Sequence, residues 1–212
     1  VFGRELWKTD GTDAGTVLVK DINPLTDNTH QISGLIDYNG TLFFAANNGI
    51  NGIELWKSNG TENSTIMVRD IYPGALSSSP ANFSIHGGFL YFTATGTNPD
   101  GVLVGRELFR TTGDELGTML VVNSFPGGSS INPNSSNPSV VVSLGENPYF
   151  TANVPIPNST TVSRRLCTIG GNSDLQIVSA AVNPLGLTKS GSLIYYTSSM
   201  FPIGNELYAS NG

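Results

Sequence analysis

A short string recurs along the chain, and its recurrence constrains the fold more than any other feature of the sequence. The string is Gly-x-Glu-Leu followed by an aromatic residue, and it occupies residues 3–7, 52–56 and 105–109. A degenerate copy lies at residues 164–168 and a truncated last copy at residues 204–212. The shared leucine falls at positions 6, 55, 108, 166 and 207, a period of roughly 50 residues. Such self-similarity is typical of architectures that repeat one supersecondary unit.

Each period of the sequence predicts four short strands. An aromatic segment such as residues 42–46 precedes the second to fifth copies of the string, and an apolar segment such as residues 17–22 follows the first three. A weaker apolar segment, residues 34–38, comes before the aromatic one, and Asn39-Gly40 between them is a strong signal for a type I′ hairpin turn. No segment has a sustained 3.6-residue apolar period, so we expect almost no helix. Four strands in this length match one propeller blade.

We therefore predict an all-β fold, a β-propeller-like repeat of four-stranded antiparallel blades, in a single domain covering residues 1–212. It has about four units and is incomplete at both ends. The approximate units are 1–24, 32–74, 82–128, 139–182 and 184–212.

The string resembles the defining motif of the ELWxxDGT-repeat family. Residues 5–12, Glu-Leu-Trp-Lys-Thr-Asp-Gly-Thr, match that motif completely, and the copy at residues 54–61 departs only in having Asn59 for the aspartate. The resemblance covers nearly the whole chain and is poorest in residues 164–184. It implies propeller-like repeats on large secreted or surface-anchored proteins, and no catalytic residues, because the motif is a structural signature. The signature residues are Glu5, Leu6, Trp7, Gly11, Glu54, Leu55, Trp56, Gly60, Glu107, Leu108 and Phe109.

Composition excludes several classes of function. The chain carries ten Lys and Arg and a net charge of −6, with no basic cluster, so we expect no binding to nucleic acid. Its apolar runs are far shorter than the roughly 20 residues that span a bilayer. The single cysteine, Cys167, is expected to be a small buried apolar residue. With only His30 and His86 as histidines, most nucleophile–base pairs are excluded, and we expect no enzyme.

The glutamate of the string, Glu5, Glu54, Glu107 and Glu206, allows two interpretations. A ring of carboxylates could bind a metal or a cationic ligand. The favoured interpretation is a solvated strand face, or pairing with Arg4, Arg106 or a neighbouring lysine.

The tryptophans and the turns also allow two interpretations each. Trp7 and Trp56 could stack on sugars, but the favoured prediction places them in the core. The oxygen-rich turns at residues 10–13 and 59–63 could hold calcium, but they lack the Asp-x-Asp spacing of a calcium loop, so hairpin turn chemistry is favoured and no cofactor is expected.

Six Asn-x-Ser/Thr sequons mark possible N-glycosylation sites, slightly more than composition alone would give. They begin at Asn39, Asn59, Asn63, Asn82, Asn134 and Asn158.

The chain begins and stops within a repeat unit. Three alternatives fit: a piece of a larger propeller, closure with the terminal strands completing one blade, or a surplus strand that pairs with the next molecule and builds a filament. We predict a non-enzymatic, extracellular or cell-surface repeat protein that assembles with itself or belongs to a longer parent chain, as a fibre subunit or part of an adhesin. The alternative is a propeller-type binding module for a glycan or protein ligand.

Overall fold

The computed structural model describes residues 4–24, 32–129, 132–156, 161–170, 174–179, 182–200 and 204–212, and these contain strands and no helix. The strands are β1 (Leu6–Lys8), β2 (Val17–Lys20), β3 (Ser33–Tyr38), β4 (Thr41–Asn47), β5 (Ile53–Ser58), β6 (Ile66–Arg69), β7 (Ala81–His86), β8 (Phe89–Thr97), β9 (Leu103–Thr111), β10 (Met119–Val122), β11 (Gly128–Ser129), β12 (Asn132–Pro133), β13 (Val142–Leu144), β14 (Asn147–Pro155), β15 (Val162–Ile169), β16 (Leu175–Ile177), β17 (Leu185–Ser190), β18 (Leu193–Met200) and β19 (Gly204–Ser210).

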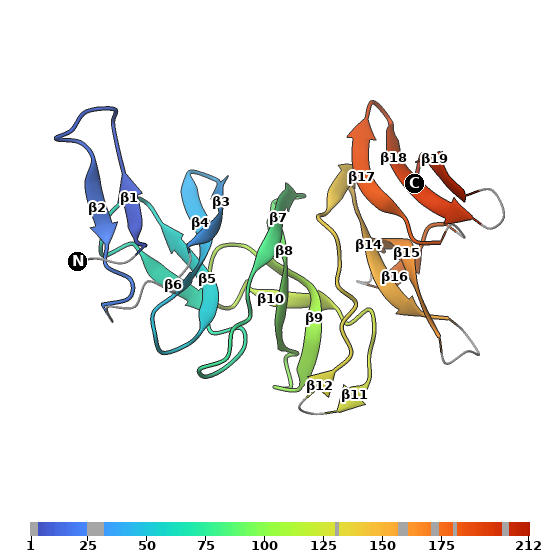
Figure 1. Ribbon diagram of the computed structural model, residues 1–212, viewed down its shortest axis with the longest axis horizontal. Coiled ribbons are helices and arrows are strands. Elements are labelled where there is room, and N and C mark those ends of the chain that lie inside the picture. Colours follow the sequence, from blue (N-terminus) through green and yellow to red (C-terminus); the bar gives the residue numbers. More distant parts are fainter. Residues whose placement is uncertain are drawn as a thin grey trace.

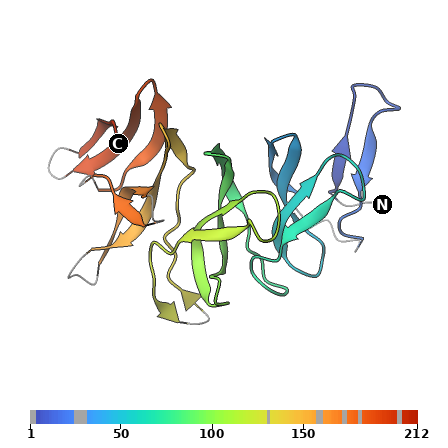
Figure 2. The ribbon, with the colours of Figure 1, turned by 180° about the vertical axis from the view of Figure 1, so that it is seen from behind.

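The strands form a series of antiparallel sheets in chain order. Sheet 1 is β1–β2, sheet 2 is β3–β6, sheet 3 is β7–β10, sheet 4 is β13–β16 and sheet 5 is β17–β19, while β11 and β12 form a separate small ribbon. Within each sheet, strands adjacent in sequence are adjacent in space. The predicted all-β fold with four-stranded antiparallel units is therefore confirmed. The described residues form no closed propeller: sheet 1 lies at one end of the long axis and sheets 4 and 5 at the other (Figures 1 and 2).

Turn chemistry fixes the register of the first two strands in each unit. Asn39 and Gly40 have φ of 54° and 77°, as a type I′ turn requires, and they join β3 to β4 with Tyr38 opposite Thr41. The predicted hairpin is confirmed. Gly87 and Gly88 adopt the same left-handed backbone at the corresponding turn of sheet 3.

The core lies between sheets, because adjacent residues of a strand point to opposite faces. In the first four copies of the string the leucine faces the following sheet, and from the second copy onward the next residue faces the preceding sheet. Leu55 of sheet 2 packs with Phe92 and Phe109 of sheet 3. The corresponding contacts of the other junctions are Leu6 with Phe44 and Trp56, Leu108 with Phe150 and Cys167, and Leu166 with Ile194 and Tyr196.

The two tryptophans differ because only one has a sheet behind it. Trp56 packs against sheet 1 and is 6% exposed, so the predicted core position is confirmed for this residue. Trp7 is 52% exposed, and the prediction is wrong for it. Sheet 1 has no described sheet against the face on which Trp7 lies, so no described sheet covers this side chain.

Candidate functional site

The buried glutamate of the string is the most unusual group in the fold. Glu54 is 0% exposed. Its Oε2 accepts hydrogen bonds from the Ile71 amide (2.9 Å) and the Ser78 hydroxyl (2.6 Å), and its Oε1 accepts one from the Ser78 amide (3.0 Å). Ile71 and Ser78 belong to the linker between sheets 2 and 3. The carboxyl therefore ties its own sheet to the segment that leads into the next one.

Glu107 repeats this arrangement one unit later. It is fully buried, and it accepts from the Ser124 amide (3.0 Å), the Ser136 amide (2.9 Å) and the Ser136 hydroxyl. The interpretation of these glutamates as a solvated face, or as partners of arginine, is wrong for Glu54 and Glu107. The reason is that the linker folds over the strand end and supplies backbone donors, which local strand alternation does not reveal.

The remaining copies of the glutamate position differ. Glu5 is half-buried and accepts from the Ile22 amide at 2.8 Å, which is the same bond that Ile71 makes to Glu54. Glu206 is exposed, and Arg165 takes this position in the fourth copy. Within the described ranges, no three acidic, histidine or cysteine side chains gather where they could hold a metal ion. Glu54 and Glu107 thus each bind the linker that follows their own sheet.

Burial controls the protonation of the two buried carboxyls. Desolvation raises the pKa of Glu54 and of Glu107 to about 7, although their hydrogen bonds favour the ionised form. The Ser78 hydroxyl also lies 3.2 Å from the carbonyl oxygen of Ile53. A protonated Glu54 can therefore donate to Ser78, which then donates to Ile53, so the site accommodates both protonation states.

The glycine of the string lets the linker pass close to the strand. Gly52 has φ of +69°, and a Cβ there would lie 2.4 Å from the carbonyl oxygen of Leu76. Gly105 has φ of +68°, and its Cβ would lie 2.2 Å from the carbonyl oxygen of Asn134. Glycine and glutamate therefore act together: the first opens space for the linker, and the second binds it.

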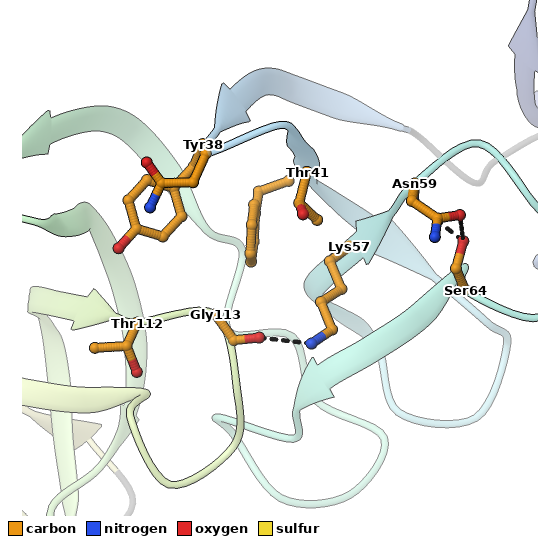
Figure 3. A pocket seen from close by; sticks show the side chains of 9 residues that line it. Tyr38, Thr41, Lys57, Asn59, Ser64, Thr112 and Gly113 are labelled. Atoms are coloured by element: carbon orange, nitrogen blue, oxygen red, sulfur yellow. Dashed lines mark hydrogen bonds between the residues drawn. The ribbon is translucent and has the colours of Figure 1, made fainter.

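Polar contacts bridge successive sheets along one rim, at the ends that carry the hairpin turns. Lys57 Nζ donates to the carbonyl oxygen of Gly113 at 2.7 Å (Figure 3). Lys8 Nζ donates to the carbonyl oxygen of Gly60 at 2.8 Å. Tyr38 likewise donates its hydroxyl to the carbonyl oxygen of Gly88 at 2.5 Å. In the next junction, the His86 ring Nε2 lies 2.9 Å from the carbonyl oxygen of Glu146. Sheets 1, 2 and 3 thus each reach a turn of the following sheet.

An open cleft of about 310 Å³ lies on this rim between sheets 2 and 3. Tyr38, Thr41, Asn59 and Thr112 are among its lining residues, and Lys57 crosses it to reach Gly113 (Figure 3). The wall offers hydroxyl, amide and ammonium groups beside an aromatic ring. Such a mixture suits a polar, hydroxylated ligand better than an apolar one.

The turns after the string are closed by hydroxyl groups. Asp10 Oδ1 accepts from the amide (3.0 Å) and the hydroxyl (2.7 Å) of Thr12, and these bonds lower the pKa of Asp10. Paired hydroxyls seven residues apart close each turn, at Thr9–Thr16, Ser58–Thr65 and Thr111–Thr118. The Asp10 carboxylate and the paired hydroxyls are therefore engaged in these turns, as hairpin turn chemistry predicts.

The sequon asparagines fall into two groups. Asn39, Asn59 and Asn63 are exposed in turns of sheet 2. The side-chain amide Nδ2 of Asn82 donates a hydrogen bond to Thr93 Oγ1 (3.3 Å). The Nδ2 of Asn134 donates one to the carbonyl oxygen of Pro126 (3.2 Å). Asn158, like His30, lies outside the described residues.

Cys167 is a core residue, as predicted. It is fully buried between sheets 3 and 4, and burial raises the pKa of its thiol to about 12. The thiol is therefore protonated and inaccessible at neutral pH.

The bridging lysines and the serines that bind the buried carboxyls were not identified from the sequence. The repeat could have indicated the lysines, because Lys8, Lys57 and Arg110 occupy the same position in successive copies. No sequence pattern indicates the serines, because Ser78 and Ser136 lie at different distances, 24 and 29 residues, after their glutamates.

The chain matches no protein-family model and no curated protein. Across the ranges that the structure describes, no helix has the length and apolar character needed to cross a membrane. The junctions themselves therefore carry the functional argument.

Proposed function

We propose that this chain is a non-enzymatic structural repeat protein of the extracellular space or the cell surface, a fibre subunit or part of an adhesin, whose sheets are blades of a propeller-like array. The observation that supports this is the use of the signature side chains. Leucine packs on the next sheet, glutamate binds the linker, and lysine binds the next turn. The glutamate carboxyl and the lysine ammonium of the motif thus form hydrogen bonds that join one unit to the next.

The pattern suits a protein whose task is to extend. Repeats that contact mainly their neighbours add stability unit by unit, so an array can grow without redesign of its core. The buried core of each junction is apolar and its rim is polar, which is how durable interfaces are built.

Immunogold electron microscopy of the source cells, with antibodies against this chain, tests the proposal. We expect label on surface layers, fibres or secreted material. Label confined to the cell interior would overturn the proposed location and role.

The cleft between sheets 2 and 3 favours a second candidate, a binding module for a glycan. Its polar lining supports this alternative. A glycan array tests it: specific binding that is lost in Asn59→Ala, which changes an exposed lining residue, would favour the binding module over the purely structural role.

A further inference from the structure

Two faces of the array are unmatched halves of the same junction. Leu207 of sheet 5 is 70% exposed, whereas its counterparts Leu55, Leu108 and Leu166 are fully buried against a following sheet. Trp7 of sheet 1 is 52% exposed, whereas its counterpart Trp56 is buried against a preceding sheet. One end of the array thus presents the leucine half of a junction, and the other end presents the aromatic half.

We propose that these two faces bind each other between molecules, with sheet 5 of one copy docking its Leu207 face on the Trp7 face of sheet 1 of a second copy. The proposal rests on the proposed structural function and names its partner. The four junctions within the chain supply the reason for this occupant, because each one covers a leucine face with an aromatic face. Leu18, opposite Trp7 in the β1–β2 pair, extends the apolar surface that the second copy would cover.

The geometry of this contact predicts head-to-tail assembly, which ends in a ring if the rotation between copies closes and continues as a filament if it does not. Sheets 1 and 5 lie at opposite parts of the long axis, so the contact is heterologous and does not use one patch twice (Figures 1 and 2). A heterologous contact that does not close on itself propagates into a filament. Each added copy again presents one free Leu207 and one free Trp7.

The contact between copies would lack one element of the first two internal junctions. The position of Lys8 and Lys57 is taken by Ala209 in sheet 5, so no ammonium reaches the turn glycine, Gly11, of the second copy. We therefore expect association weaker than the internal junctions and dependent on concentration. Ala209→Lys should restore the bridge and tighten association about three- to tenfold, the effect of one partly exposed charged hydrogen bond.

Sedimentation velocity of residues 1–212 over a wide concentration range tests the proposal. We expect wild type to form species that grow with concentration, and Trp7→Glu and Leu207→Glu each to remain monomeric. A mixture of the two variants should form a one-to-one dimer and nothing larger, because each retains the face that the other has lost. Leu116→Glu is the matched control, since Leu116 is 92% exposed outside both faces, and it should associate as wild type does.

Three results would overturn the proposal: a wild-type chain that stays monomeric, variants that associate as wild type does, or a variant mixture that forms no dimer. Circular dichroism checks that each variant is folded. If a glutamate variant unfolds, Ala209→Lys tests the docking instead, because it changes an exposed residue and should leave the fold intact. Association of Ala209→Lys equal to that of wild type would then contradict the docking. If the docking is contradicted, a repeat of a longer chain is the remaining partner for the Leu207 and Trp7 faces. The immunogold experiment would still test the proposed structural role independently.

Discussion

The ammonium of Lys57 lies 2.7 Å from the carbonyl oxygen of Gly113, a residue 56 positions later and in the next sheet. Lys8 makes the same bond to Gly60 across the preceding junction. The motif thus contains both halves of one contact, the lysine of one copy and the turn glycine of the next. This relationship explains why the two residue types recur together, and it sets the first prediction.

Replacing Lys57 with methionine should destabilise the fold by about 1 kcal/mol, the net value of a partly exposed hydrogen bond to a charged donor. Methionine keeps most of the apolar stem, so the loss reports the ammonium. Urea unfolding measures the change in free energy. Lys189→Met, at an exposed site, is the control and should change stability little. Equal effects at both positions would contradict the bridge.

Replacing Glu54 with glutamine should cost about 1–3 kcal/mol despite the similar shape. Each carboxyl oxygen accepts a backbone amide, from Ile71 or from Ser78, so the glutamine NH₂ faces a donor in either orientation. One buried amide then loses its acceptor. Glu206→Gln, at the exposed copy of the same position, should be neutral in the same unfolding assay. A neutral Glu54→Gln would show that the linker is held by other contacts.

The buried carboxyls should also make stability depend on pH. Burial raises the pKa of Glu54 and Glu107 to about 7 in the folded chain, above the ordinary value of 4.5. Their protonated forms therefore stabilise the fold below pH 4.5, and this contribution is lost as the pH rises from 4.5 through about 7. We expect the urea midpoint to fall over this interval. A variant with glutamine at both positions should show a flatter profile; an equally steep one would assign the dependence to other groups.

The close approach at Gly52 predicts a large cost for a methyl group. Gly52→Ala adds a Cβ 2.4 Å from the Leu76 carbonyl oxygen at a φ of +69°. Gly40 has a similar φ of +77° but no atom within 4 Å of its Cβ position, so Gly40→Ala isolates the backbone strain. We expect about 1–2 kcal/mol for Gly40→Ala and about 1–3 kcal/mol more for Gly52→Ala. Thermal unfolding compares the pair, and similar losses would contradict a steric role for the linker.

Glycan occupancy should follow the two groups of sequons. In a secretory host that glycosylates, we expect Asn39, Asn59 and Asn63 to be occupied, because they lie in exposed turns. Asn82 and Asn134 should be occupied less, because their side-chain nitrogens are hydrogen-bonded within the fold. Glycopeptide mass spectrometry measures each site. Higher occupancy at Asn134 than at Asn39 would contradict this order.

Local signals in the sequence predict the strands and turns well. Asn39-Gly40 and the apolar run of β4 specify a hairpin through chemistry confined to a few neighbouring residues. The role of Glu54 was not predictable in the same way, because its partners are two backbone amides and the Ser78 hydroxyl, which lie 17 and 24 residues away. Trp7 and Trp56 share the Glu-Leu-Trp-Lys string and differ in burial, so their environments depend on which sheet lies behind them.

The bonds of the buried carboxyls also set the order in which parts of the fold can form during translation. Glu54 is bound by residues that follow it by 17 and 24 positions, and Glu107 by residues that follow by 17 and 29. During synthesis on the ribosome, Glu54 and Glu107 therefore cannot form these hydrogen bonds until the later residues have been added to the chain. The buried glutamate of a sheet can be fully hydrogen-bonded only after the linker that follows that sheet has been synthesised. Folding of each sheet should therefore be completed after translation has passed its last strand.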